Sequence, residues 1–146
     1  MGVEAAGIYR RTQAERDHER LSWERADQAF FAAAACHVLA WTCRDLHASR
    51  SIEIVALRFV DVQHAFHAVA TWEDWSFDHC GWHRVSELLS ANEEFEGRAI
   101  ECLVVSGDIA DFCEQHRSRM PAQFWADPVP RAREYVKQFV PPWMQP

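Results

Sequence analysis

The chain has 146 residues, of which 49% are hydrophobic and 25% charged, so it can bury one core and is not a disordered or low-complexity segment. Its 15 Lys and Arg residues against 22 Asp and Glu residues give a formal net charge of −7. This charge disfavours binding to a nucleic-acid backbone or an anionic membrane surface. The five cysteines are odd in number and irregularly spaced, which is typical of reduced thiols in a cytoplasm.

No apolar run approaches the roughly 18 residues that a membrane helix needs. The N-terminus also lacks the apolar segment of a secretory signal. We therefore expect a cytoplasmic protein, or one that is delivered without a classical signal peptide, and no contact with a membrane.

The hydrophobic pattern predicts helices first, a small antiparallel sheet in the middle, and helices at the end. Residues 1–28 form a charged helical lead-in, and the Ala-rich residues 30–46 form a largely buried helix. Further strands are expected over residues 51–60, 64–72, 75–78 and 98–105, and further helices over residues 85–92, from 109 onward and from 128 to 139. Gly81 is expected to end the third strand, residues 93–96 to form a solvated loop, and Trp143 to dock back on the domain. Because no linker or repeat interrupts the pattern, residues 1–146 are predicted to form one α+β domain.

Cys36 lies near the start of the Ala-rich helix, where a helix N-terminus supplies a positive field and free N–H donors to a thiolate. This holds if the helix begins near Ala34, whereas a start at Asp27 places Cys36 in mid-helix. The bulky aromatic pair at residues 30–31 favours a break before the alanines that follow it. A helical neighbour such as His37 points about 100° away, so the base for this thiol must come from another segment.

His67 begins a small, apolar stretch, and Asp78 follows it by eleven residues after a turn at residues 73–74. An antiparallel hairpin returns Asp78 to the level of His67, close enough to hold the imidazole in one tautomer. Nucleophile, base and orienting residue would then be Cys36, His67 and Asp78. His64 is a rival base, but on a strand it faces the opposite side from His67.

Two segments resemble small bacterial papain-fold toxin and effector domains: FFAAAACHVLAW and HAFHAVATWEDWSFDHCGWH. Those domains carry an aromatic-x-Ala-x-Ala-Cys-His-x-Leu-Ala segment, then His-apolar-x-apolar, a turn and Phe-Asp-x-x-Gly. This resemblance covers about residues 28–83. The order of Cys, His and Asp along the chain also resembles that of the wider papain-like and transglutaminase-like superfamily. It implies a papain-like fold, a protein target, and a triad of Cys36 as nucleophile, His67 as base and Asp78 as third member. Papain-type enzymes carry an oxyanion-hole Gln six residues before the Cys; here that position is Phe30, which leaves the Cys36 N–H as donor.

A zinc site is the alternative use of these residue types. Cys36, Cys43 and His47 fall within about 40° of one another on a helical wheel, and Cys80 or His83 could complete a tetrahedral set. The chain has no Cys-x-x-Cys or His-Glu-x-x-His spacing, however. Along a helix the first and last of the three lie about 16 Å apart, too far for one ion. No metal or cofactor is therefore expected.

We expect thiol-dependent acyl chemistry on a protein or peptide amide: the reaction of a cysteine peptidase, a glutamine deamidase or a transglutaminase-like enzyme. The alternative is a non-catalytic acidic protein of the immunity type, whose negative charge would attract a cationic protein partner. Alkylation separates the two, because an activated Cys36 reacts faster than the other four thiols, whereas equal, slow labelling favours the binding protein.

Overall fold

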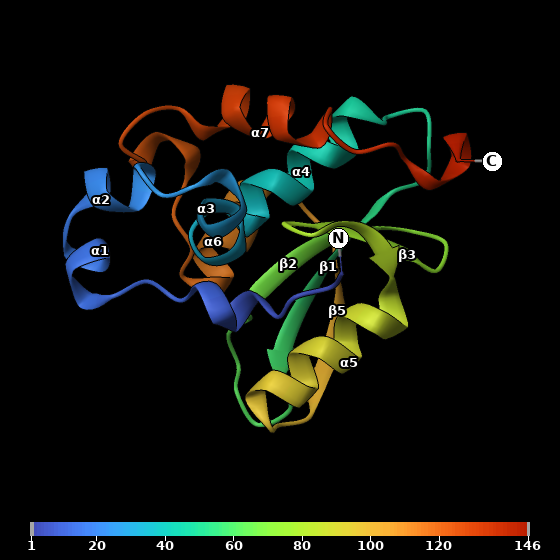
Figure 1. Cartoon of the computed structure of the whole chain (residues 1–146), viewed down its shortest axis with the longest axis horizontal. Helices are drawn as coiled ribbons and strands as arrows, with labels where there is room; N and C mark the ends of the chain where they lie inside the picture. The colour runs from blue at the N-terminus through green and yellow to red at the C-terminus, as the bar shows by residue number, and fades with distance from the viewer. Residues whose placement is uncertain (1, 146) are drawn as a thin grey trace.

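The computed structural model describes residues 2–145 and has an α+β architecture, which confirms the predicted class (Figure 1). An antiparallel sheet has the strand order β4-β3-β2-β1-β5. The strands are β1 (Glu53–Phe59), β2 (His67–Trp72), β3 (Trp75–Asp78), β4 (Gly81–Arg84) and β5 (Ile100–Val105). The α-helices are α1 (Gln13–Asp17), α2 (Glu19–Trp23), α3 (Asp27–Ala33), α4 (Cys36–Leu46), α5 (Val85–Glu96), α6 (Ile109–His116) and α7 (Pro128–Val136). Short 3-10 helices are η1 (Ala6–Tyr9), η2 (Pro121–Gln123) and η3 (Pro142–Met144). Among these described helices, none combines the length and the hydropathy needed to cross a bilayer.

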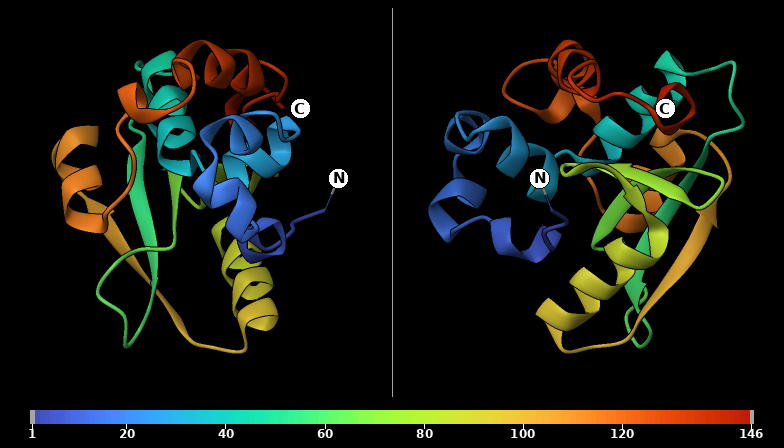
Figure 2. Two further views of the ribbon diagram at one scale, coloured as in Figure 1. Left: turned by 90° about the vertical axis from the view of Figure 1, so that its left-hand side faces the viewer. Right: turned by 45° about the vertical axis from the view of Figure 1, so that its right-hand side comes forward.

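Alternation along the strands gives the sheet two apolar faces. On β1, Ile54 and Ala56 belong to the larger buried cluster, whereas Val55 and Leu57 belong to a smaller one with Leu88 of α5. Helix α4 packs between the sheet and α7, and α5 lies on the other side of the strands (Figures 1 and 2). The sheet is therefore covered on both faces, and α4 is fixed between two layers.

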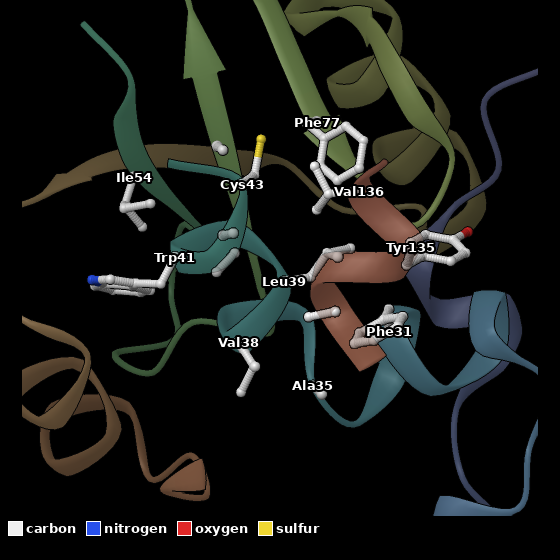
Figure 3. Packing of buried hydrophobic residues seen from close by; sticks show 14 of the residues in the cluster. Phe31, Ala35, Val38, Leu39, Trp41, Cys43, Ile54, Phe77, Tyr135 and Val136 are labelled. Carbon is white, nitrogen blue, oxygen red and sulfur yellow. The ribbon is translucent and has the colours of Figure 1, made fainter. Parts of the chain in front are cut away.

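The central position of α4 follows from its apolar residues. Leu39 and Cys43 point from this helix into a cluster that includes Phe77 of β3 and Val136 of α7 (Figure 3). All four side chains are almost fully buried. Removing a buried side chain such as Leu39 would cost about 2–5 kcal/mol, so this packing firmly fixes the axis of α4 and the place where its N-terminus emerges.

A break in the chain gives α4 an N-terminus of its own. The carbonyl of Phe30 accepts hydrogen bonds from the N–H groups of both Ala34 and Ala35, each at 3.0 Å, and this ends α3. The Phe30 and Phe31 rings are buried and meet each other edge-on. Phe30 also meets Phe124 edge-on and Phe31 lies tilted against Tyr135, so tertiary packing outweighs the helix propensity of the alanines. Helix α4 consequently begins at Cys36, so this cysteine lies in the first turn, as expected for a helix that starts near Ala34 and not at Asp27.

Several local predictions are wrong. The charged lead-in is not one helix, because the extended backbone of His18 separates α1 from α2. Gly81 does not end the third strand, because β3 stops at Asp78. Gly81 instead begins β4, a strand that was not expected, and its φ of 84° allows a two-residue turn between β3 and β4. The acidic residues 93–96 are helical, because α5 continues to Glu96, where Gly97 with a φ of 65° caps it. The predicted helix over residues 30–46 is divided at residues 34–35 and not before Ala32, and the remaining predicted elements shift at their ends only.

The C-terminal tail docks on the domain, as expected. Trp143 is half-buried, and its ring meets those of Trp72 and Trp82 edge-on, at centroid distances of 5.1 Å and 5.6 Å. His47, at the end of α4, contacts the same ring. These rings cover the outer end of α4, away from Cys36.

Candidate active site

Cys36 lies at the N-terminus of α4 and is half-buried. Within residues 2–145, the backbone N–H groups of Cys36, His37 and Val38 have no hydrogen-bond acceptor, which is the usual state of the first turn of a helix. Free N–H donors and the positive end of the helix dipole stabilise a thiolate at this position.

His67 and Asp78 meet across two neighbouring strands. His67 is the first residue of β2 and Asp78 the last of β3, and these strands pair with Ala70 opposite Phe77. Because side chains alternate along a strand, His67 and Asp78 share the sheet face opposite to that of Phe77. Nε2 of His67 donates a hydrogen bond of 3.0 Å to Oδ2 of Asp78, and both side chains are buried. The structure therefore brings together the two residues that the hairpin argument paired.

The hydrogen bond to Asp78 selects one tautomer of His67. With the proton held on Nε2, the other ring nitrogen, Nδ1, carries the lone pair. Nδ1 is buried and makes no hydrogen bond of standard geometry within residues 2–145. It is thus the atom of His67 that is available to accept a proton from Cys36.

Cys36 and His67 act on each other's ionisation. Burial disfavours the Cys36 thiolate, but hydrogen bonding to His37 and His67 and the charge of both imidazoles outweigh it and lower the pKa of the thiol to about 5. Burial also disfavours the charged form of His67, while Asp78 and Cys36 outweigh it and raise its pKa to about 9. Between these values the two groups form a thiolate–imidazolium pair, which is the reactive form of a catalytic cysteine.

Asp78 is held by more than His67. Its Oδ1 accepts the N–H of Cys80 at 2.9 Å, and Nδ1 of His79 lies 3.3 Å from Oδ2. Burial opposes ionisation of Asp78, but the charge of His79 and the hydrogen bonds from the two histidines keep the pKa of the carboxyl well below its usual range. Asp78 is therefore a fixed anion, able to orient His67 without taking its proton.

The role of His79 was not predicted from the sequence. This fully buried residue lies in the turn between β3 and β4, and its Nε2 donates to the carbonyl of Glu4 at 3.1 Å. Burial disfavours its charged form, but the charge of Asp78 and hydrogen bonding to Asp78 and Cys80 outweigh burial and raise the pKa of His79 to about 10. The Tyr135 hydroxyl also donates to the His79 carbonyl. The N-terminal segment and α7 thus clamp the turn that carries Asp78.

His37 is a second imidazole on Cys36. Its Nε2 donates to the carbonyl of Arg119 at 2.6 Å, and its ring stacks on Phe112. Burial disfavours the charged ring, but hydrogen bonding to Cys113 and Cys36 outweighs it and raises the pKa of His37 to about 10. His37 was not expected to serve as the base. Its hydrogen bond to Arg119 agrees with a fixed positive neighbour of the thiolate rather than a mobile proton carrier.

The remaining candidates serve elsewhere. Cys43 is in the core, where burial raises the pKa of its thiol, and exposed Cys102 has its pKa raised by burial and by Glu93. His64 precedes β2 and is not on a strand, so the facing argument does not apply to it; its Nδ1 instead bonds the carbonyl of Gln115 at 3.0 Å. Only Cys36, of these cysteines, has a lowered pKa.

The described residues do not bring together the cysteines and histidines considered as an alternative zinc site. Among residues 2–145, the one group of potential ligands within 4.8 Å of one another is His67, Asp78 and His79. An ion there would have to displace the hydrogen bond between His67 and Asp78. That bond suits the orientation of a base better than it suits a metal site.

No family model, no curated protein and no solved structure matches this chain. The site must therefore be interpreted from its own geometry.

Proposed function

We propose that this chain is a thiol enzyme that transfers an acyl group from a protein or peptide amide, with a triad of Cys36, His67 and Asp78 in a papain-like or transglutaminase-like arrangement. The observation that carries the proposal is the buried hydrogen bond between Asp78 and His67, together with a thiol at a helix N-terminus whose pKa His67 helps to lower. A merely structural cysteine needs neither an oriented imidazole nor a lowered pKa.

The chemistry proceeds in two halves. The Cys36 thiolate attacks the amide carbonyl carbon, and the C=O electron pair moves onto oxygen to give a tetrahedral oxyanion. The oxyanion collapses, the C–N bond breaks, and protonated His67 gives its Nδ1 proton to the departing amine or ammonia. A thioester then remains on Cys36. His67 next removes a proton from water or from an incoming amine, which attacks the thioester and releases Cys36 as thiolate.

The oxyanion needs donors, and the sequence offers no Gln at the usual spacing. Phe30 occupies that position and is buried in the core, and the amide oxygen of Gln28 accepts a hydrogen bond from the Tyr9 hydroxyl. The N–H groups that begin α4, starting with that of Cys36, are the nearest free donors to the sulfur. They supply the oxyanion hole in this proposal.

Three outcomes distinguish the reactions that share this first half. We would incubate the protein with a casein digest and a biotinylated primary amine, in the presence of EDTA, and read products by mass spectrometry. New peptide termini identify a peptidase, conversion of Gln to Glu identifies a deamidase, and biotin on Gln identifies a transglutaminase. Each product must vanish in Cys36→Ala and persist in a Cys102→Ala control, whose thiol lies outside the site.

Alkylation tests the proposal without a known substrate. Cys36 must react with iodoacetamide at mildly acidic pH far faster than Cys102. Equal and slow labelling of all five thiols would refute an activated cysteine and favour the acidic binding protein.

A further inference from the structure

A cavity of about 140 Å³ lies between η1, α1 and α3. Its lining combines three arginines with small or apolar residues: Ala6, Gly7, Arg10, Arg11, Arg16, Ala32, Ala33 and Phe66. None of the described residues that line it is acidic. This volume is below the roughly 300 Å³ of a typical small-molecule site and suits a single functional group.

The cavity borders both halves of the candidate active site. Ala33 precedes Cys36 by three residues, so their Cα atoms lie within about 11 Å even if the chain between them is extended. Phe66 directly precedes His67, and the two rings stack with a centroid distance of 6.4 Å. A substrate side chain bound in the cavity would therefore lie within about three peptide residues of the substrate amide that Cys36 attacks.

The positive charge of the cavity is only partly compensated. Arg10 pairs with both carboxylate oxygens of Glu96, but neither Arg11 nor Arg16 has an ion-pair partner within residues 2–145. Nη1 of Arg11 is buried and has no hydrogen-bond partner there. Glu19, the acid that acts on Arg11, already binds Arg119.

The pKa of Arg11 reflects the same excess of positive charge. Burial, followed by the charges of Arg119, Arg16 and Arg25, lowers its pKa despite the opposing effect of Glu19. A buried guanidinium donor without an acceptor is costly, and a bound oxyanion would satisfy it.

We propose that this arginine-lined cavity is a specificity site that binds the carboxylate of a Glu or Asp side chain close to the attacked amide. This inference rests on the proposed function for the identity of the reaction, but the cavity and its charges are independent of that reaction. In this proposal Arg11 and Arg16 supply the donors for the carboxylate, because Arg10 is already paired with Glu96. The occupant is thus an acidic peptide segment.

Binding can be measured without turnover by using Cys36→Ser protein. We would titrate it with acetyl-Ala-Glu-Ala-amide and with acetyl-Ala-Gln-Ala-amide, and follow the arginine Nε–Hε signals by NMR. We expect the Glu peptide to shift the Arg11 and Arg16 signals and to bind about tenfold or more tightly than the Gln peptide. Arg11→Gln and Arg16→Gln should each abolish most of this preference.

A matched control separates a site from net charge. Arg133→Gln removes the same charge from an exposed position on α7, and it should leave the preference intact. Equal binding of the two peptides, or equal losses in Arg133→Gln and Arg11→Gln, would overturn the proposal. A phosphoserine peptide and inorganic phosphate form a further arm: tight binding of these, with no preference for Glu over Gln, would overturn the carboxylate assignment.

The outcome is distinguishable from failure of the proposed function. Slow alkylation of Cys36 in the unmodified protein would remove the enzyme but leave the peptide preference as evidence for an acidic ligand. Fast alkylation without a preference for Glu would keep the enzyme and remove the specificity site.

Discussion

Replacing His67 by Gln should change the pH profile of Cys36 alkylation in a defined way. In the unmodified protein the rate should rise through an inflection at about 5, stay nearly flat, and rise again near 9, where His67 loses its proton and frees the thiolate from its ion pair. In His67→Gln the lower inflection should move upward, because one of the two stabilising imidazoles is gone, and the inflection near 9 should disappear.

The choice of pH decides whether the effect is visible. With a pKa of about 5 rather than the ordinary 9.0, the Cys36 thiolate fraction at pH 6 is about 900-fold higher. A less basic thiolate is also a weaker nucleophile, and a Brønsted slope of about 0.45 over this interval costs about 60-fold. Compared with a thiol of ordinary pKa, Cys36 should therefore react about 15-fold faster at pH 6, at about the same rate at pH 7, and about sixfold more slowly at pH 8. Assays at neutral pH alone would miss an activated Cys36.

The assay is site-resolved labelling with iodoacetamide from pH 4.5 to 10, quantified by peptide mass spectrometry. Exposed Cys102 is the internal reference, since its pKa is raised and its rate should fall steeply with acidity. His37→Gln is the matched variant: it too should raise the lower inflection, but it should keep the one near 9. A single Cys36 inflection above pH 8 in the unmodified, folded protein would refute the ion pair, whatever the variants do.

Three further substitutions test the surroundings of the site. His79→Gln removes a positive charge beside Asp78, so the imidazolium of His67 should gain stability and the upper inflection should move up by about one pH unit; no shift, or a downward one, would contradict this. Gly81→Ala should lower the free energy of unfolding in urea by about 2–3 kcal/mol, because φ is 84° and the added Cβ would lie 2.5 Å from an aromatic ring carbon. Asn92→Leu should cost about 1–3 kcal/mol in the same assay, since its buried Oδ1 accepts a backbone N–H of the N-terminal segment at 3.1 Å; an unchanged urea midpoint would count against that role.

Local pattern was enough to predict the pairing of His67 with Asp78. Two alternating strands joined by a tight turn have a determined register, and register decides which side chains share a face. The start of α4 was harder, because alanine favours helix on both sides of the break. What ends α3 is the burial of the Phe30 and Phe31 rings against aromatic residues more than 90 positions away, which no local pattern encodes.

The contributions of His79 and of the arginine cavity could not be predicted from the sequence for the same reason. His79 is clamped by Glu4, which is 75 residues distant along the chain, and by Tyr135, 56 residues distant. Taken locally, an Asp-His-Cys-Gly run indicates only a turn. Arg11 and Arg16 belong to a charged segment that, by composition, has the properties of a solvated helix, and only its fold against α3 and Phe66 makes a cavity.

Net charge is a poor guide to the field at Cys36. The chain carries a formal charge of −7, yet the thiol lies at a helix N-terminus between His37 and His67, with Arg11 and Arg16 in the adjoining cavity. At about 0.15 M salt the Debye length is about 8 Å, so distant exposed carboxylates are screened while groups in contact with the sulfur are not. The same chain therefore repels polyanions at long range and stabilises a thiolate, and in our proposal a substrate carboxylate, at short range. This explains how a protein with a negative net charge can still carry an anion-stabilising centre.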